Sequence, residues 1–132
     1  MSKWIWFYDL VDQKLGPLLA EYHFTKQTGK EYEEDEDKDW SAGIFYMSDS
    51  GTRAGVDILT RYDIFAPDLP LIYLVRVDFA KGTLKEWLYP NLRAETKDVH
   101  LWMGWKCPTE DDVKIAFDEI EIGLRKYLAE HE

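Results

Sequence analysis

The chain has 132 residues, of which 45% are hydrophobic, and it carries a net charge of −10 at pH 7. This size and apolar content suit one domain with its own core and exclude a disordered chain; no apolar run reaches the roughly 18 residues of a bilayer span. The lone Cys107 excludes an internal disulfide, and the N-terminus lacks a signal-peptide layout. We therefore expect a single domain over residues 1–132, located in the cytoplasm.

The first predicted element is a strand over Lys3 to Val11. Its apolar side chains alternate, which puts one set on each face of a strand, and because both sets are apolar we expect a central position in the sheet. A turn follows at Asp12 to Pro17. The run from Leu18 to Phe24 also alternates and favours a returning strand, although Pro17 equally suits the start of a short helix.

The segment after Thr28 is dominated by carboxylates. Residues Glu31 to Asp39 hold seven acids and one base, and such crowded like charges predict an exposed acidic loop at 29–39. Asp35, Asp37 and Asp39 have the spacing that opens an EF-hand loop. That pattern fails further on, because its glycine position holds Trp40 and its glutamate position holds Tyr46.

The middle of the chain shows the clearest strand patterns. Ile44 to Ser48 is predicted to be a strand, 49–52 a turn, and Val56 to Phe65 a second strand with Asp57 on its polar face. A third strand is predicted from Leu71 to Phe79, because its core face is rich in β-branched residues while Arg76 and Asp78 share the other face.

The segments that follow are less regular. Thr83 to Tyr89 fits either a helical turn or a strand, and Pro90 ends it in both cases. Asp98 to Lys106 alternates again, so a last strand is predicted there.

The longest periodic segment lies at the end of the chain. An apolar stripe with helical spacing predicts an α-helix after Pro108, with Thr109 as its N-cap and three acids in the first turn, where the helix dipole favours negative charge. The stripe consists of Val113, Phe117, Ile120, Leu124 and Leu128. A one-sided helix needs an apolar surface. We therefore predict an α+β fold: a curved antiparallel sheet of about five to seven strands with this helix packed on one face.

Catalytic and cofactor motifs are missing from the sequence. His23 and His100 are isolated, Cys107 has no flanking pattern that would make it a thiolate, and no glycine-rich phosphate loop joins a strand to a helix. No Cys/His pairs have zinc-ligand spacing. We accordingly expect a protein that is not an enzyme and that uses no cofactor and no metal.

The charge imbalance lies in two segments. Residues 31–39 carry −6 and residues 108–132 carry −5, whereas the remainder carries +1. No Lys/Arg cluster is available for a phosphate backbone, so direct nucleic-acid binding is disfavoured. A charged loop is often only a solvated spacer, but here aromatics bracket the acids and could anchor a partner. The predicted partner-binding residues are Tyr32, Glu33, Glu34, Asp35, Glu36, Asp37, Asp39 and Trp40.

These features favour a non-enzymatic inhibitor of a basic protein, such as a nuclease or another nucleic-acid-binding protein, with no contact to nucleic acid itself or to membrane. Toxin-immunity proteins and phage anti-defence inhibitors commonly share this small, acidic, aromatic-rich profile. Two alternatives stay open. One is a small enzyme with a carboxylate and a histidine between sheet and loop, and the other is an assembly subunit that pairs sheet edges. As an inhibitor, the protein is expected to be a monomer or a weak dimer.

Overall fold

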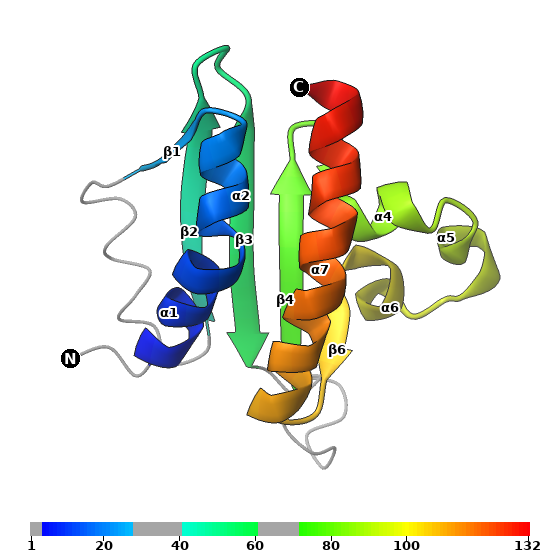
Figure 1. Cartoon of the computed structure of the whole chain (residues 1–132). Helices are drawn as coiled ribbons and strands as arrows, with labels where there is room; N and C mark the ends of the chain where they lie inside the picture. Colours follow the sequence, from blue (N-terminus) through cyan, green and yellow to red (C-terminus); the bar gives the residue numbers. More distant parts are fainter. Residues whose placement is uncertain (1–3, 28–40, 61–71) are drawn as a thin grey trace.

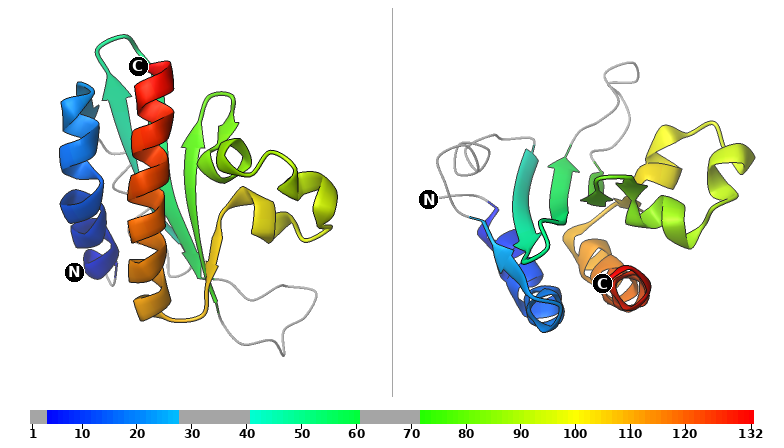
Figure 2. Two further views of the ribbon diagram at one scale, coloured as in Figure 1. Left: turned by 45° about the vertical axis from the view of Figure 1, so that its right-hand side comes forward. Right: turned by 90° about the horizontal axis from the view of Figure 1, so that it is seen from above.

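A computed structural model describes residues 4–27, 41–60 and 72–132. Six described strands form an open antiparallel sheet with the order β1-β2-β3-β4-β5, and β6 also pairs with β4. Figure 1 shows helices α1, α2 and α7 side by side on one face of this sheet, while α4, α5 and α6 lie beyond β4. The end-on view in Figure 2 separates the two layers. The predicted α+β fold is therefore confirmed.

The prediction of a strand at Lys3 to Val11 is wrong. The chain forms helix α1, Ile5–Lys14, and the buried side chains follow a helical period through Trp4, Phe7 and Val11. An aromatic-rich run fits both periods when most of its positions are apolar, and the choice depends on the surface that buries it. Pro17 lies near the start of α2, Gly16–Glu21, so the favoured returning strand is also wrong over most of its length; only β1, Phe24–Lys26, is extended.

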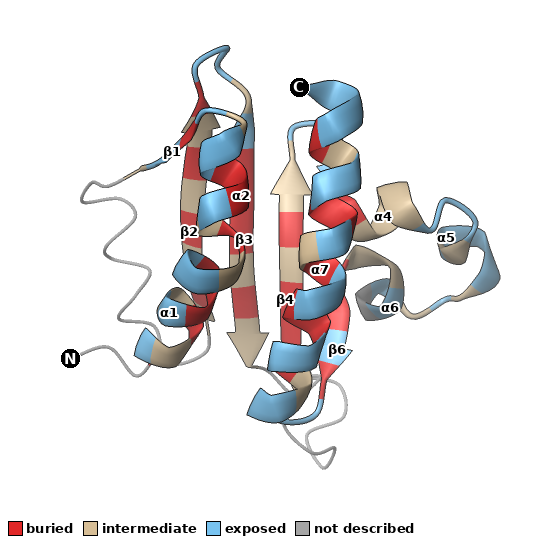
Figure 3. Ribbon diagram, viewed as in Figure 1, coloured by how far each residue is buried: buried red, intermediate tan, exposed pale blue. Residues whose placement is uncertain are grey.

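The central strands agree with the predicted pattern. β2, Ser41–Ser48, and β3, Arg53–Thr60, form a hairpin, and β3 pairs along its length with β4, Tyr73–Phe79. Buried residues recur along all three strands (Figure 3), and the buried apolar side chains of β2 and β3 join those of the helices in one core, as do Val75 and Val77 of β4. The predicted extensions over 61–65 and at Leu71 lie outside the described residues.

The region after β4 is more helical than predicted. β5, Gly82–Thr83, leads into three short helices, which are α4, Leu84–Leu88, α5, Leu92–Glu95, and α6, Val99–Met103. The predicted strand over 98–106 is thus wrong except for β6, Trp105–Cys107. The pairing along the free edge of β4 explains why only three residues of this segment form a strand. β5 pairs with the last two residues of β4, and β6 pairs with its first three. Val99 and Leu101 of α6 remain 46% and 38% exposed.

The C-terminal helix is confirmed in detail. α7, Glu110–His131, begins with a capping box in which Thr109 and Asp112 satisfy each other's backbone N–H groups. All five residues of the predicted stripe are fully buried. Phe117 packs edge-on against Phe7 of α1, with ring centroids 6.1 Å apart. On the α4 side, Gly123 leaves room for Leu88, which would lie 2.5 Å from a Cβ atom at that position.

Candidate functional site

The residues predicted from sequence to bind a partner lie outside the described structure. They belong to the segment that joins β1, which ends at Lys26, to β2, which begins at Ser41. The structure therefore neither brings them together nor separates them. The residues concerned are Tyr32, Glu33, Glu34, Asp35, Glu36, Asp37, Asp39 and Trp40.

The acids of the described residues gather on one layer of the molecule. We call α1, α2 and α7 together the helical layer; its outward side is exposed in Figure 3. The three helices carry four basic residues, Lys14, Lys114, Arg125 and Lys126, against ten acids. The excess of carboxylates is thus presented on a single side of the sheet. The acids are Asp9, Asp12, Glu21, Glu110, Asp111, Asp112, Asp118, Glu119, Glu121 and Glu130.

Ion pairs neutralise part of this layer. Lys14 Nζ donates to Asp118 Oδ1 at 2.8 Å, which ties α1 to α7, and this hydrogen bond raises the pKa of Lys14. Arg125 Nη1 donates to Glu21 Oε2 at 3.2 Å, which ties α7 to α2. These pairs are exposed, and solvent screening leaves exposed pairs only a small effect on stability. They fix side chains in place more than they stabilise the fold.

Two carboxylates in the first turn of α7 remain available to a partner. Glu110 and Asp111 are exposed, and the only ion pair they make among the described residues is a 4.0 Å contact between Asp111 and Lys114. The helix dipole stabilises negative charge at this end. These side chains can therefore meet a cation without breaking a structural bond.

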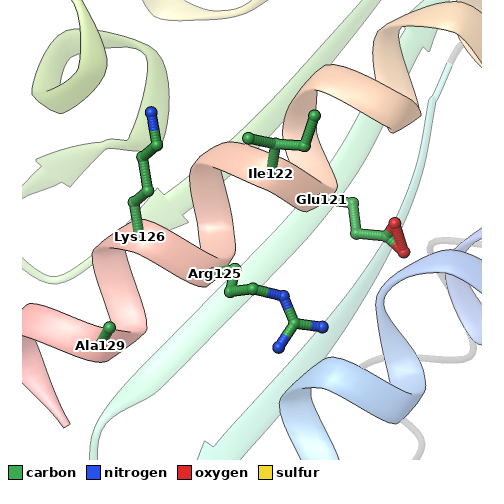
Figure 4. A pocket seen from close by; sticks show the side chains of 5 residues that line it. All are labelled: Glu121, Ile122, Arg125, Lys126 and Ala129. Atoms are coloured by element: carbon green, nitrogen blue, oxygen red, sulfur yellow. The ribbon is translucent and has the colours of Figure 1, made fainter.

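A shallow hollow lies on the outward side of α7. Its volume is about 340 Å³, and it is lined by Glu121, Ile122, Arg125, Lys126 and Ala129, all from one helix. In Figure 4, Arg125 and Glu121 extend toward the neighbouring helix, whereas Lys126 extends to the opposite side. The hollow thus combines charged side chains with the exposed apolar surface of Ile122.

The other face of the sheet carries a charge cluster that sequence reasoning did not identify. Arg76 donates two hydrogen bonds of 2.9 Å to the carboxylate of Asp57, its cross-strand neighbour. Asp78 lies on the same face, and burial, followed by repulsion from Asp57, raises the pKa of its carboxyl. Burial also raises the pKa of Asp57 against the opposing effect of Arg76. The sequence signal was present, since both predicted strands had charges on one face, but pairing them required the register.

Of the residues considered for catalysis, the structure describes the side chains of Cys107 and His23. Burial raises the pKa of the Cys107 thiol to about 11, so it stays protonated at neutral pH. His23 occupies an exposed turn with a positive φ of 64° after α2, and no hydrogen bond or ion pair joins it to a carboxylate within the described part of the chain. The side chain of His100 lies outside the described part.

Comparisons with known proteins add no assignment. No family model, no curated protein and no solved structure matches the chain. Over residues 4–27, 41–60 and 72–132, no group of three or more His, Cys, Asp or Glu side chains is placed to hold a metal ion. None of the helices in these ranges combines the length and the apolar composition of a membrane span.

Proposed function

We propose that the protein is a non-enzymatic inhibitor that binds a basic protein through carboxylates of the helical layer and of residues 31–39. The observation that carries this proposal is the one-sided excess of acids on α1, α2 and α7. A field of one sign speeds the encounter with a partner of opposite sign, and it disfavours acidic partners and nucleic acid.

The class of partner follows from the same chemistry. Proteins that bind nucleic acid present clustered Lys and Arg side chains to phosphates. A surface of carboxylates offers those side chains equivalent charge and hydrogen-bond acceptors, and it can cover a cationic cleft. A nuclease, or another nucleic-acid-handling protein, therefore suits the helical layer best, as in toxin-immunity or phage anti-defence systems.

The test begins with affinity capture from the native host, followed by surface plasmon resonance with the captured protein. The double variant Glu110→Gln/Asp111→Asn should slow association, because it removes two exposed charges of the helical layer. The dissociation rate should change little. The matched control, Asp49→Asn/Glu95→Gln, removes two exposed charges elsewhere and should leave the association rate near that of the wild type. Inhibition is then measured on the partner's own nucleic-acid cleavage or binding.

Residues 31–40 are tested separately. Neutralising Glu34, Asp35, Glu36 and Asp37 should also lower the association rate, whereas Trp40→Ala should mainly raise the dissociation rate. An aromatic anchor acts after the encounter, and its loss can cost about 2 kcal/mol. Binding that ignores salt and all of these substitutions, or a captured partner that is not basic, would contradict the proposal.

A further inference from the structure

The outward side of α7 carries apolar residues in a line. Ile115 and Ile122 are 67% and 62% exposed, and Ala129 follows in the same register. A spacing of seven residues is almost two helical turns, so the three side chains share one stripe, opposite the buried one. Single exposed apolar residues need no explanation, but an aligned pair of isoleucines on a helix is a surface suited to another helix.

Charges flank this stripe in a mirrored order. Asp118 and Glu119 come four and three residues before Ile122, and Arg125 and Lys126 come three and four residues after it. Glu119 and Lys126 are seven residues apart and lie on the α4 side of the stripe, as the contact of Glu119 with Tyr89 shows. Asp118 and Arg125 lie on the side of α1 and α2, to which they bind through Lys14 and Glu21.

We propose that α7 is a homodimer interface, in which a second copy of the chain lays its own α7 antiparallel across Ile122. A two-fold axis through Ile122 brings residues about equally far before and after it to the same level, and it keeps each flank on its own side, so residues of the same flank face each other. Glu119 then meets Lys126 of the second copy, Asp118 meets Arg125, and Ile115 meets Ala129. The surface is thus complementary to itself.

The charges also determine the direction of the second helix. A parallel pair would bring opposite flanks together and place Glu119 against Asp118 and Lys126 against Arg125, and such like-charge contacts are unfavourable. Among the described residues Lys126 makes no ion pair of its own, so its charge is available to the second copy. Asp118 and Arg125 keep their ion pairs with α1 and α2. Their contact across the interface links these pairs of the two copies into a longer network of charges.

The interface is small and predicts a weak dimer. A contact centred on one helix buries less than the roughly 1,200 Å² at which stable complexes begin, and each chain carries a net charge of −10 that opposes association. Self-association is therefore concentration-dependent. The inference goes beyond the proposed function and does not rest on it, because it concerns the purified protein alone.

The experiment is sedimentation equilibrium of the purified chain over a range of concentrations at physiological salt. The wild type should show a monomer–dimer equilibrium. Glu119→Lys and Lys126→Glu should each raise the dimer dissociation constant at least about tenfold, because each places two like-charge pairs in the interface. The double variant Glu119→Lys/Lys126→Glu should restore dimerisation. The two residues of one chain lie about 10 Å apart along the helix, so the rescue must occur between chains.

Mixing gives a second, independent readout. The two single variants, each defective alone, should form a heterodimer. The lysine introduced in one chain then faces the glutamate introduced in the other, and the second pair on the same flank remains the native Lys126 with Glu119. Glu95→Lys and Lys97→Glu repeat the same charge changes on the α5–α6 side and should leave the wild-type equilibrium unchanged. Circular dichroism melts verify that every variant is folded. A wild type that stays monomeric at all concentrations, or a double variant without rescue, overturns the proposal.

Discussion

The pairing of Asp57 with Arg76 shows how one guanidinium group can stabilise neighbouring carboxylates on the face of a sheet. Both side chains are about three-quarters buried, at 26% and 25% exposure, and two parallel hydrogen bonds fix their geometry. Asp78 shares the same guanidinium electrostatically. Arg76 therefore opposes the burial that raises the pKa of both carboxyls, and its removal should leave two poorly solvated anions.

Arg76→Met should lower the free energy of unfolding at pH 7 by about 1–3 kcal/mol, the cost of leaving a charged group without its hydrogen bonds. The pKa of both carboxyls then rises further above the unfolded value. A carboxyl with a raised pKa stabilises the fold below the unfolded pKa and loses that contribution as the pH rises through the folded pKa. The deficit should therefore shrink towards pH 3, as measured by urea titrations.

The matched control for this substitution is Arg53→Met. Arg53 is exposed and lies 3.9 Å from the centre of the Phe45 ring, a contact of about 0.5–1 kcal/mol. Arg53→Met should lower the free energy of unfolding only slightly, and by the same amount at pH 7 and at pH 3. Equal pH profiles for the two variants would show that Arg76 does not act through the carboxyls.

At the scale of elements, α7 has two distinct faces. Its inner stripe closes the core against the sheet and α1, and its outer stripe is the proposed dimer surface. The capping box defines its start, and the ion pairs of Asp118 and Arg125 hold α1 and α2 beside it. Substitutions on the two faces should therefore separate folding from association.

Phe117→Ala should lower the free energy of unfolding by about 3–5 kcal/mol, as truncation of a buried aromatic does. Its ring is fully buried against Phe7. Ile115→Ala, two residues earlier on the exposed face, should cost less than about 0.5 kcal/mol, because little area is lost from the core. Both values come from denaturant titration at low protein concentration. Similar costs for the two variants would mean that the buried face of α7 is assigned incorrectly.

At the scale of the whole molecule, the charge of the described residues is one-sided. The helical layer carries most of the described acid excess, whereas Arg93, Lys97 and Lys106 accompany the acids around α5 and α6. Residues 31–39 add a further −6 between β1 and β2. Repulsion among so many like charges works against the folded state, so relieving it should not destabilise the molecule.

Replacing Glu33 to Asp37 with Gly and Ser should leave the melting temperature nearly unchanged or raise it. β1 and β2 pair through residues outside this segment, and fewer like charges remain to repel. Thermal unfolding at low and high salt measures the change, which should be largest at low salt because salt screens exposed charges. A fall of many degrees would show that these carboxylates make structural bonds.

Sequence alone determined the elements whose pattern is local. α7 was predicted with its cap and the five large side chains of its buried stripe, because 22 residues of helical period admit only one face. The central strands were also predicted, since β-branched alternation between turn residues excludes a helix. The acid excess of α7 was predicted from the sequence. That these acids share one layer with the acids of α1 and α2 was not predicted.

The tertiary structure decided the segments that fit two patterns. Residues 4–11 are apolar at almost every position, so strand and helix both bury them, and packing against α7 and the sheet selects the helix. Residues 99–103 were excluded from the sheet because β5 and β6 occupy the free edge of β4. The pairing of Asp57 with Arg76 depended on strand register, and the self-complementary face of α7 on knowing which side chains the core leaves exposed. Both depend on contacts between segments distant in sequence, which no local period encodes.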